Sequence, residues 1–544
     1  MFNIKNLWQK KNEHPLGSPQ QAEKLLGELA VEDPYKALGE IIFWLGSVKE
    51  AEGFKLGERI AILKLIDDTG QSCKRKLSSD YLAAAVRAQK TQEHRLWAVL
   101  NEYCKKRHEV YLYCLDEIKA SPTTDASLRN NLPLIMARAM RALAEQKKWA
   151  YMRYRLIEDR VWHDIAALTF MAESEGASRS LLSLYPDEKT STSVVTELIK
   201  LLMLDVSSPN SLTPRRLDIS ERLIAEFSGA FEISETRTAN SAFYIDLSAP
   251  KAPSRIPENL ELNSTTFFFS AAGALPKLQT MLTTLHERGK QAGMEFVADI
   301  SALELQDVVK HLIAHWSPSA PKRQHERSSE LSRFHVLHTF AQIHKRVADY
   351  AKKVEPVLIE NKDILYMERV DLKLYGFVTE KTKKLIAEAA EKYAQSEAED
   401  EDTETWTMEN KSASGFGATI PQLNEDWVKV GSLVALKRQD ESGWHVGVIR
   451  RMIRDAEFKV LVGIQALSPD SAIAVNLSSI ADAVHITGLL LPAHEEGDVL
   501  LLAKGSFVQN KGFHLYAGES KRSIRLVRVI ERGEDFELVA FSSA

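Results

Sequence analysis

Cysteine is scarce in this chain: Cys73, Cys104 and Cys114 are the three among 544 residues. A count that is odd and low argues against a disulfide framework, and the spacings lack the CxxC pairs of a structural zinc site. We therefore expect three reduced thiols, a cytoplasmic location and no bound metal.

Long apolar runs and an excess of one charge are also missing. No stretch of about 18 uninterrupted apolar residues occurs, which predicts no membrane span. The first residues, MFNIKNLWQKKNEHPLG, lack an apolar core of signal-peptide length, so no signal peptide is expected. The net charge is −5, whereas general nucleic-acid binders are usually basic because phosphate neutralisation dominates their binding. We expect no nucleic-acid partner, and any anion site must be a local patch.

Signatures of catalysis are absent too. The sequence has no Walker loop and no GxSxG elbow. His311 and His315 lie four residues apart, but no HExxH glutamate and no third ligand accompany them, so packing roles are expected. We expect no enzyme, no catalytic residue and no cofactor.

The first 232 residues have a helical pattern. Apolar residues recur at spacings of three and four from about residue 20 to 230. The stretch from Tyr81 to Ile118 contains no Gly or Pro, which favours one long helix or two joined by a tight turn. We predict that residues 1–232 form a helical scaffold or interaction domain that binds a protein partner.

Short β-favouring runs follow this helical region. Phe243 to Leu247 and Thr265 to Ser270 are typical of strands, and Leu275 to Leu285 and Leu303 to Trp316 of amphipathic helices. The pattern predicts a small α+β middle segment at residues 233–320.

The remainder alternates a predicted helical insertion with many strands. Arg333 to Phe340 is expected to be a strand, Ile343 to Tyr393 helical, and the acidic run from Glu397 to Glu404 a solvated linker. Further strands are expected at Ser432–Lys437, Trp444–Ile449, Phe458–Ile464, Val499–Ala503, Ile524–Ile530 and Phe536–Phe541. Strands at this spacing suggest a barrel, so the predicted fold class is α+β.

Two short polar patterns stand beside these strands. Arg323 and Arg327 are four apart with Lys322 next to them, and guanidinium groups bind phosphate or the O6 and N7 acceptors of guanine in bidentate fashion. The second pattern, from Asn410 to Gly417, reads NKSASGFG and is expected to be a turn. Its Asn and Ser side chains can accept from base N–H groups, and its glycines allow close approach of a ligand.

Together with the strands that follow, these patterns resemble the PilZ domain family, a six-stranded barrel that binds cyclic di-GMP. The family carries RxxxR ahead of the barrel and (D/N)xSxxG inside it. The first motif is matched by Arg323 and Arg327. The second motif and the family's later strand pattern are matched by Asn410, Ser412, Gly415, Gly431, Val446-Gly447-Val448 and Val462-Gly463-Ile464. The resemblance covers about residues 320–470.

The resemblance implies a domain at residues 321–475 and a mode of ligand binding. The two motifs are about 80 residues apart, so we expect a helical insertion and acidic linker at about 343–404, and a β-rich extension at 476–544. Arg323 and Arg327 would close over cyclic di-GMP while Asn410, Ser412 and Gly415 hold it against the barrel. Lys322, Arg450 and Arg451 complete the candidate ligand-binding residues.

Some alternatives remain open. Arg450 and Arg451 suit phosphate contacts and a charged strand edge about equally. A different register pairs Arg450 and Arg454 with Asn476 to Ala481, but it lacks the final glycine. Asn410 stands where the family more commonly has Asp. The GGDEF and EAL motifs of cyclic di-GMP synthases and hydrolases are absent. The main hypothesis is a cyclic di-GMP receptor that couples ligand binding to the helical region; the alternative is a helical adaptor whose PilZ-like module binds no ligand.

Overall fold

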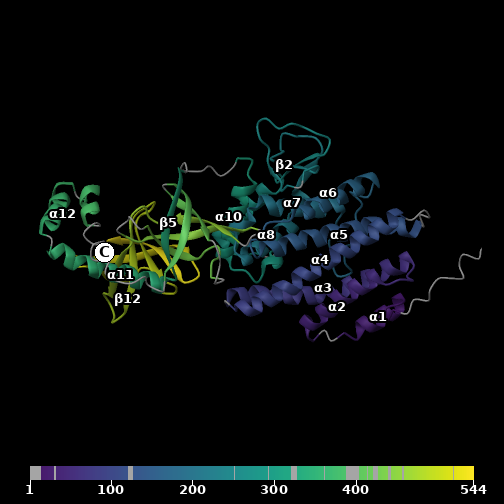
Figure 1. Cartoon of the computed structure of the whole chain (residues 1–544), viewed down its shortest axis with the longest axis horizontal. Helices are drawn as coiled ribbons and strands as arrows, with labels where there is room; N and C mark the ends of the chain where they lie inside the picture. Colours follow the sequence, from purple (N-terminus) through teal and green to yellow (C-terminus); the bar gives the residue numbers. More distant parts are fainter. Residues whose placement is uncertain are drawn as a thin grey trace, which may run out of the picture. The chain divides into compact units, whose positions relative to one another are not determined.

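The computed structural model describes residues 14–29, 32–87, 89–120, 126–249, 251–291, 293–319, 328–360, 362–375, 377–386, 403–412, 414–420, 427–438, 443–455, 459–518 and 520–543. The chain forms two compact units, Met1–Pro321 and Lys322–Ala544 (Figure 1). Each unit is described by itself.

The first unit is built mainly from long helices. They are α1 (Pro19–Gly27), α2 (Pro34–Glu50), α3 (Leu56–Val86), α4 (Lys90–Ala120), α5 (Ala126–Tyr151), α6 (Asp159–Ser174), α7 (Val194–Val206), α8 (Pro214–Glu226), α9 (Leu275–Arg288) and α10 (Ala302–Trp316). The side chains of Ser18, Asp33 and Thr213 each accept a backbone N–H three residues on and precede a proline, which fixes where α1, α2 and α8 begin. Of the two possibilities for Tyr81 to Ile118, two helices are present.

A small antiparallel sheet belongs to the same unit. Its strands are β1 (Glu232–Ser234), β2 (Phe243–Asp246), β3 (Ser254–Arg255) and β4 (Thr266–Ser270), in the order β1-β4-β2-β3. All five residues of β4 are buried, and Phe269 and Trp316 share one hydrophobic core with the helices from α1 onward. The expected middle segment at 233–320 is therefore not a separate unit, because its apolar face packs on that core.

The helices also enclose a charged centre. The carboxylate of Asp67 on α3 is fully buried and lies 2.6 Å from Arg107 Nε of α4 and 3.5 Å from Arg138 Nη1 of α5. Hydroxyl groups donate to the same carboxylate from Tyr103, Tyr111 and Tyr185. Burial by itself would raise the pKa of Asp67, but the two guanidinium groups and the hydroxyls outweigh it and lower that pKa. A buried charge is tolerated here because it is fully paired.

The second unit begins with a closed barrel of six strands. They are β5 (Ser328–His338), β6 (Glu404–Ser412), β7 (Gly415–Ile420), β8 (Leu433–Arg438), β9 (His445–Arg454) and β10 (Val460–Ala466), in the order β10-β7-β6-β5-β8-β9. The interior is apolar, with Phe334, Trp406, Met408 and Met452 almost wholly buried. Glu404 was expected to end the linker and Asn410 to Ser412 to belong to a turn. They lie in the strand β6 instead, because Trp406 and Met408 alternate with polar residues and fill the barrel.

The expected C-terminal extension is a second closed barrel. Its strands are β11 (Ile473–Ser479), β12 (His485–His494), β13 (Gly497–Ala503), β14 (Gly512–Ala517), β15 (Ser520–Arg532) and β16 (Phe536–Ser543), in the order β11-β12-β13-β16-β15-β14. The barrel starts at Ile473 rather than at 476 and has its own core, which includes Leu477, Leu500 and Phe513. The apolar alternation of β11, β12 and β14 was not recognised in the sequence.

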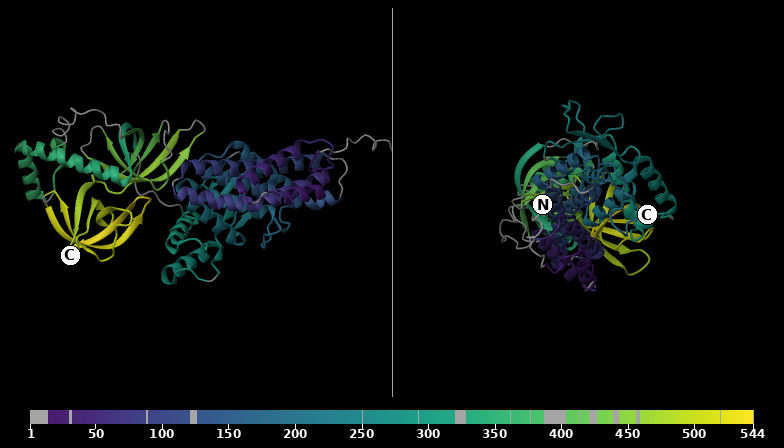
Figure 2. Two further views of the ribbon diagram at one scale, coloured as in Figure 1. Left: turned by 90° about the horizontal axis from the view of Figure 1, so that it is seen from below. Right: turned by 90° about the vertical axis from the view of Figure 1, so that its right-hand side faces the viewer.

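In the part that the structure describes, the insertion between β5 and β6 contains the helices α11 (Phe340–Glu360) and α12 (Lys362–Tyr375) and a further helical stretch at residues 380–386. The strand expected to end at Phe340 ends at His338, and Phe340 begins α11. Figure 2 shows α11 beside the green strands of the first barrel and the yellow strands of the second. Phe340, Ile343 and Val347 belong to a hydrophobic core that contains residues of both barrels. Among the described residues, no helix is long and apolar enough to cross a bilayer, and no three His, Cys, Asp or Glu side chains gather as metal ligands.

Candidate ligand-binding face of the first barrel

The second motif begins on β6, whose neighbour β5 starts directly after the first motif in the sequence. Ser328, the first residue of β5, pairs with Lys411 of β6, and Ser329 pairs with Asn410. Lys322, Arg323 and Arg327 lie outside the described residues. In the sequence, however, they immediately precede Ser328, so the long separation of the motifs reflects the insertion of α11 and α12 into one hairpin.

A β-bulge determines where Asn410 points. On β6, Met408 faces the barrel interior and pairs with Ala418, whereas Asn410 pairs with Gly417, one residue before Ala418. The extra residue, Glu409, shifts the register by one. Without this bulge, Asn410 would share the inward face of Met408; with it, the amide lies on the outside of the barrel.

A second bulge acts in the same way on β9. Met452 pairs with Val462 and Ile449 with Ile464, and all four side chains are buried in the barrel. In a regular strand, one outward-facing residue separates two inward-facing ones. Here two residues, Arg450 and Arg451, lie between the inward-facing Ile449 and Met452. The bulge therefore places two adjacent arginines on the outer surface.

Two glycines join these bulges across the sheet. Gly417 of β7 pairs with Asn410 on one side and with Gly463 of β10 on the other, and Gly463 pairs with Arg451. A Cβ atom at Gly417 would lie 2.6 Å from Asn410 Oδ1, and one at Gly463 would lie 2.8 Å from Arg451 Cγ. The side chains of Asn410 and Arg451 therefore lie directly over the backbone of Gly417 and Gly463. Only glycine leaves room for this arrangement.

Ser412 and Gly415 form the adjoining row. They pair with each other at the end of the β6–β7 hairpin, and the Ser412 hydroxyl donates to the Gly415 carbonyl at 3.3 Å. Gly415 also pairs with Gln465, and a Cβ at Gly415 would lie 2.2 Å from the Ile464 carbonyl oxygen. Here the glycine is required because β7 and β10 approach so closely.

Arg450 is held at the edge of this face. Its Nε donates to Gln465 Oε1 at 2.7 Å. Its two terminal nitrogens donate to the two carboxylate oxygens of Glu531 on β15, each at 2.6 Å. The guanidinium group is therefore in bidentate contact with the second barrel.

Five of the residues proposed from the sequence are thus brought onto one face: Asn410, Ser412, Gly415, Arg450 and Arg451. Sequence reasoning missed Gly417, Gly463 and Gln465 as members of that face. Gly417 was noted only as a residue of the expected turn, and Gly463 only as part of the family's strand pattern. The signal that could have found them is the isolated glycine inside a strand, which often marks close approach of a ligand or backbone.

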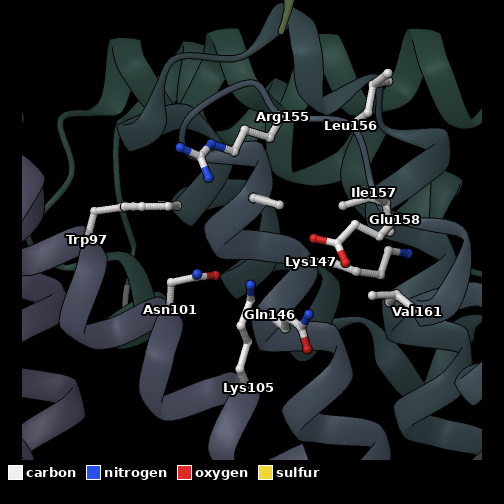
Figure 3. A pocket seen from close by; sticks show the side chains of 11 residues that line it. Trp97, Asn101, Lys105, Gln146, Lys147, Arg155, Leu156, Ile157, Glu158 and Val161 are labelled. Carbon is white, nitrogen blue, oxygen red and sulfur yellow. The ribbon is translucent and has the colours of Figure 1, made fainter. Parts of the chain in front are cut away.

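A cavity in the first unit is a weaker candidate. It lies beside α4 and α5, and Lys105, Arg155, Glu158 and Trp97 are among its lining residues (Figure 3). The Arg155 guanidinium lies over the Trp97 ring, 4.5 Å from its centroid. The cavity volume is about 50 Å³. That is room for a few water molecules at about 10–15 Å³ each, and far too little for a dinucleotide.

Comparison with known families identifies two regions. The sequence model of the N-terminal domain of the cyclic-di-GMP receptor FimW matches residues 20–238, and that of the middle PilZ domain of the same receptor matches residues 360–472. The second match ends at the boundary between the two barrels. No curated protein and no solved structure matches the chain.

Proposed function

Because the chain belongs to the FimW family of cyclic-di-GMP receptors, we propose that its first barrel binds cyclic di-GMP on the outer face that carries Asn410, Ser412 and Gly415. The observation that carries this proposal is the single row formed by Asn410, Gly417, Gly463 and Arg451. In that row the Asn410 amide and the Arg451 guanidinium lie over the backbone of two glycines.

Each member of the face has a role that its chemistry suits. Asn410 and Ser412 offer oxygen acceptors to the N1 and N2 donors of guanine. Arg451 and Arg450 offer forked N–H donors to phosphate oxygens. Gly415 lets β7 and β10 approach each other closely, and the two further glycines leave the room that Asn410 and Arg451 occupy on this face.

The arginine motif closes the site in this proposal. Arg323 and Arg327, with Lys322, stand in the sequence directly before β5, whose first residues pair with β6 beside Asn410. They are close to the link between the two compact units, which divide at Pro321 and Lys322. Ligand contacts with these residues would couple the barrel to the helical unit and to a protein partner bound there. A ligand shifts such an equilibrium only by its differential affinity for the two states.

Isothermal titration calorimetry with cyclic di-GMP tests the proposal. We expect binding by the full chain, and loss of binding for Arg323→Ala/Arg327→Ala and for Asn410→Ala/Ser412→Ala. Arg288→Ala on α9 is a matched control, because it removes an arginine from the other unit. Equal binding by wild type and both double variants would refute the site.

The second candidate function, a helical adaptor with a ligand-free barrel, is favoured by the engagement of Arg450 with Glu531. A thermal shift assay separates the two. Cyclic di-GMP at 100 times its dissociation constant would add about 2.7 kcal/mol of stability to the bound state. No shift and no heat of binding would leave the adaptor as the function.

A further inference from the structure

The two barrels of the second unit have the same strand connectivity. When the strands of each barrel are numbered from first to sixth in chain order, the first strand pairs with the second and fourth, the third with the second and sixth, and the fifth with the fourth and sixth. This holds for β5 to β10 and equally for β11 to β16, and every pairing is antiparallel. Many closed orders of six strands are possible, so this identity indicates two copies of one fold.

The second copy does not carry the asparagine and serine of the ligand motif. In the first barrel, Ser412 and Gly415 pair across the hairpin between the second and third strands. In the second barrel, His494 and Gly497 pair at the equivalent place, also with two residues between them. The glycine is retained, but Pro492 stands at the position of Asn410. The segment before β11, residues 465–472, contains no arginine or lysine.

One hairpin of the second barrel makes polar contacts with the first barrel and its insertion. Glu531, near the end of β15, forms the bidentate pair with Arg450. In the turn that follows, Glu534 accepts from Lys429 Nζ at 2.7 Å. The next residue, Asp535, accepts from the backbone N–H of Phe340 at 2.6 Å and so caps α11. Beside these polar contacts, the hydrophobic core that contains α11 includes residues of both barrels. The hairpin and α11 therefore hold the two barrels together.

We propose that the C-terminal barrel is a second PilZ-type barrel without a ligand site, and that its Glu531 competes with a ligand phosphate for Arg450. This rests on the proposed function of the first barrel. A carboxylate and a phosphate are alternative bidentate partners of one guanidinium fork. Arg450 also contacts Gln465, which pairs with Gly415, so the ion pair lies at the rim of the ligand face. Occupation of the site then weakens the contact with the second barrel, and weakening that contact strengthens ligand binding by the same factor.

The test is calorimetry with cyclic di-GMP on the full chain and on Glu531→Gln, which keeps the size of the side chain and removes its charge. We expect the variant to bind at least about fivefold more tightly. Glu534→Gln is the matched control, because it breaks an ion pair of the same hairpin away from the ligand face, and its affinity should equal that of the wild type. In an Arg450→Gln background, Glu531→Gln should have no effect.

The outcomes separate this inference from the proposed function. Absence of cyclic di-GMP binding by the wild type would refute the proposed function. It would also refute the proposed competition between Glu531 and a ligand phosphate. Binding by the wild type with equal or weaker binding by Glu531→Gln would overturn the competition and leave the ligand site standing. Circular dichroism checks folding of each variant. If Glu531→Gln does not fold, Glu531→Asp, which shortens the side chain and breaks the bidentate geometry, should show a smaller gain in affinity, and no gain would overturn the competition.

Discussion

Asn410 and Arg451 lie at opposite ends of one row across the outer face of the first barrel, with only Gly417 and Gly463 between them. Each side chain reaches that face because a β-bulge interrupts its strand, and each then lies over the glycine with which it pairs. Bulges are common beside functional sites, where they redirect a side chain. The row therefore depends on backbone geometry as much as on its polar groups.

Adding a methyl group to this row should disrupt it. In Gly417→Ala the new Cβ would lie 2.6 Å from Asn410 Oδ1, so the amide must move. We expect affinity for cyclic di-GMP, measured by calorimetry, to fall about tenfold, which corresponds to loss of one good hydrogen bond. Gly512→Ala on β14 is the control, because its Cβ would meet only the flexible side chain of Ile480 at 3.2 Å. Unchanged affinity of Gly417→Ala would contradict the row as the binding surface.

The sequence predicted the fold class and the strands of regular alternation, but not the bulges or the second barrel. Alternation alone places Asn410 on the same face as Met408; only the register with β7 shows that Glu409 is an extra residue. Register is a long-range property that a single sequence does not contain. Likewise, Asn410 to Gly417 was expected to be a turn, but β6 extends to Ser412 and β7 begins at Gly415.

The charge at position 410 should tune affinity. Asn410→Asp introduces the residue that is commoner in the PilZ motif, and hydrogen bonds to a carboxylate are roughly twice as strong as those between neutral groups. If the side chain accepts from guanine N–H groups, Asn410→Asp should bind cyclic di-GMP several-fold more tightly than wild type. Asn410→Ala should bind more weakly. Competition calorimetry with the three proteins measures this order, and the reverse order would indicate that position 410 faces a phosphate.

The buried charged centre of the first unit should dominate its stability. Asp67→Ala leaves Arg107 and Arg138 buried without their shared carboxylate, and breaking a buried pair typically costs about 3–5 kcal/mol. Urea unfolding followed by circular dichroism measures the loss. The control on the same helix is Asp80→Ala, whose carboxylate pairs with the exposed Lys76 and should cost less than about 1 kcal/mol. Similar losses for the two variants would show that the centre contributes little.

The first unit should also lose stability in mild acid, because of two histidines on α10. His311 Nε2 bonds to the Ser207 carbonyl oxygen at 2.7 Å, and the ring of His315 lies 4.3 Å from that of His311. Burial, together with smaller contributions from the neighbouring His311 and Arg255, lowers the pKa of His315 to about 4. The pKa of His311 is also lowered, by burial first, although its bond to Ser207 opposes the shift.

The sign of the pH effect follows from these directions. In the unfolded chain a histidine has a pKa of about 6.5, so between about pH 6.5 and pH 4 the unfolded state binds more protons than the folded state. The free energy of unfolding then has its highest value above about pH 6.5 and decreases as the pH falls from there to about pH 4. The decrease is at most about 1.4 kcal/mol for each unit by which the pKa differs between the folded and unfolded states. His315→Gln cannot take up this proton, so its urea midpoint should fall less between pH 7.5 and pH 5 than that of the wild type. His286→Gln, on the exposed face of α9, should retain the wild-type fall. An equal fall in His315→Gln and wild type would mean that another group carries the acid sensitivity.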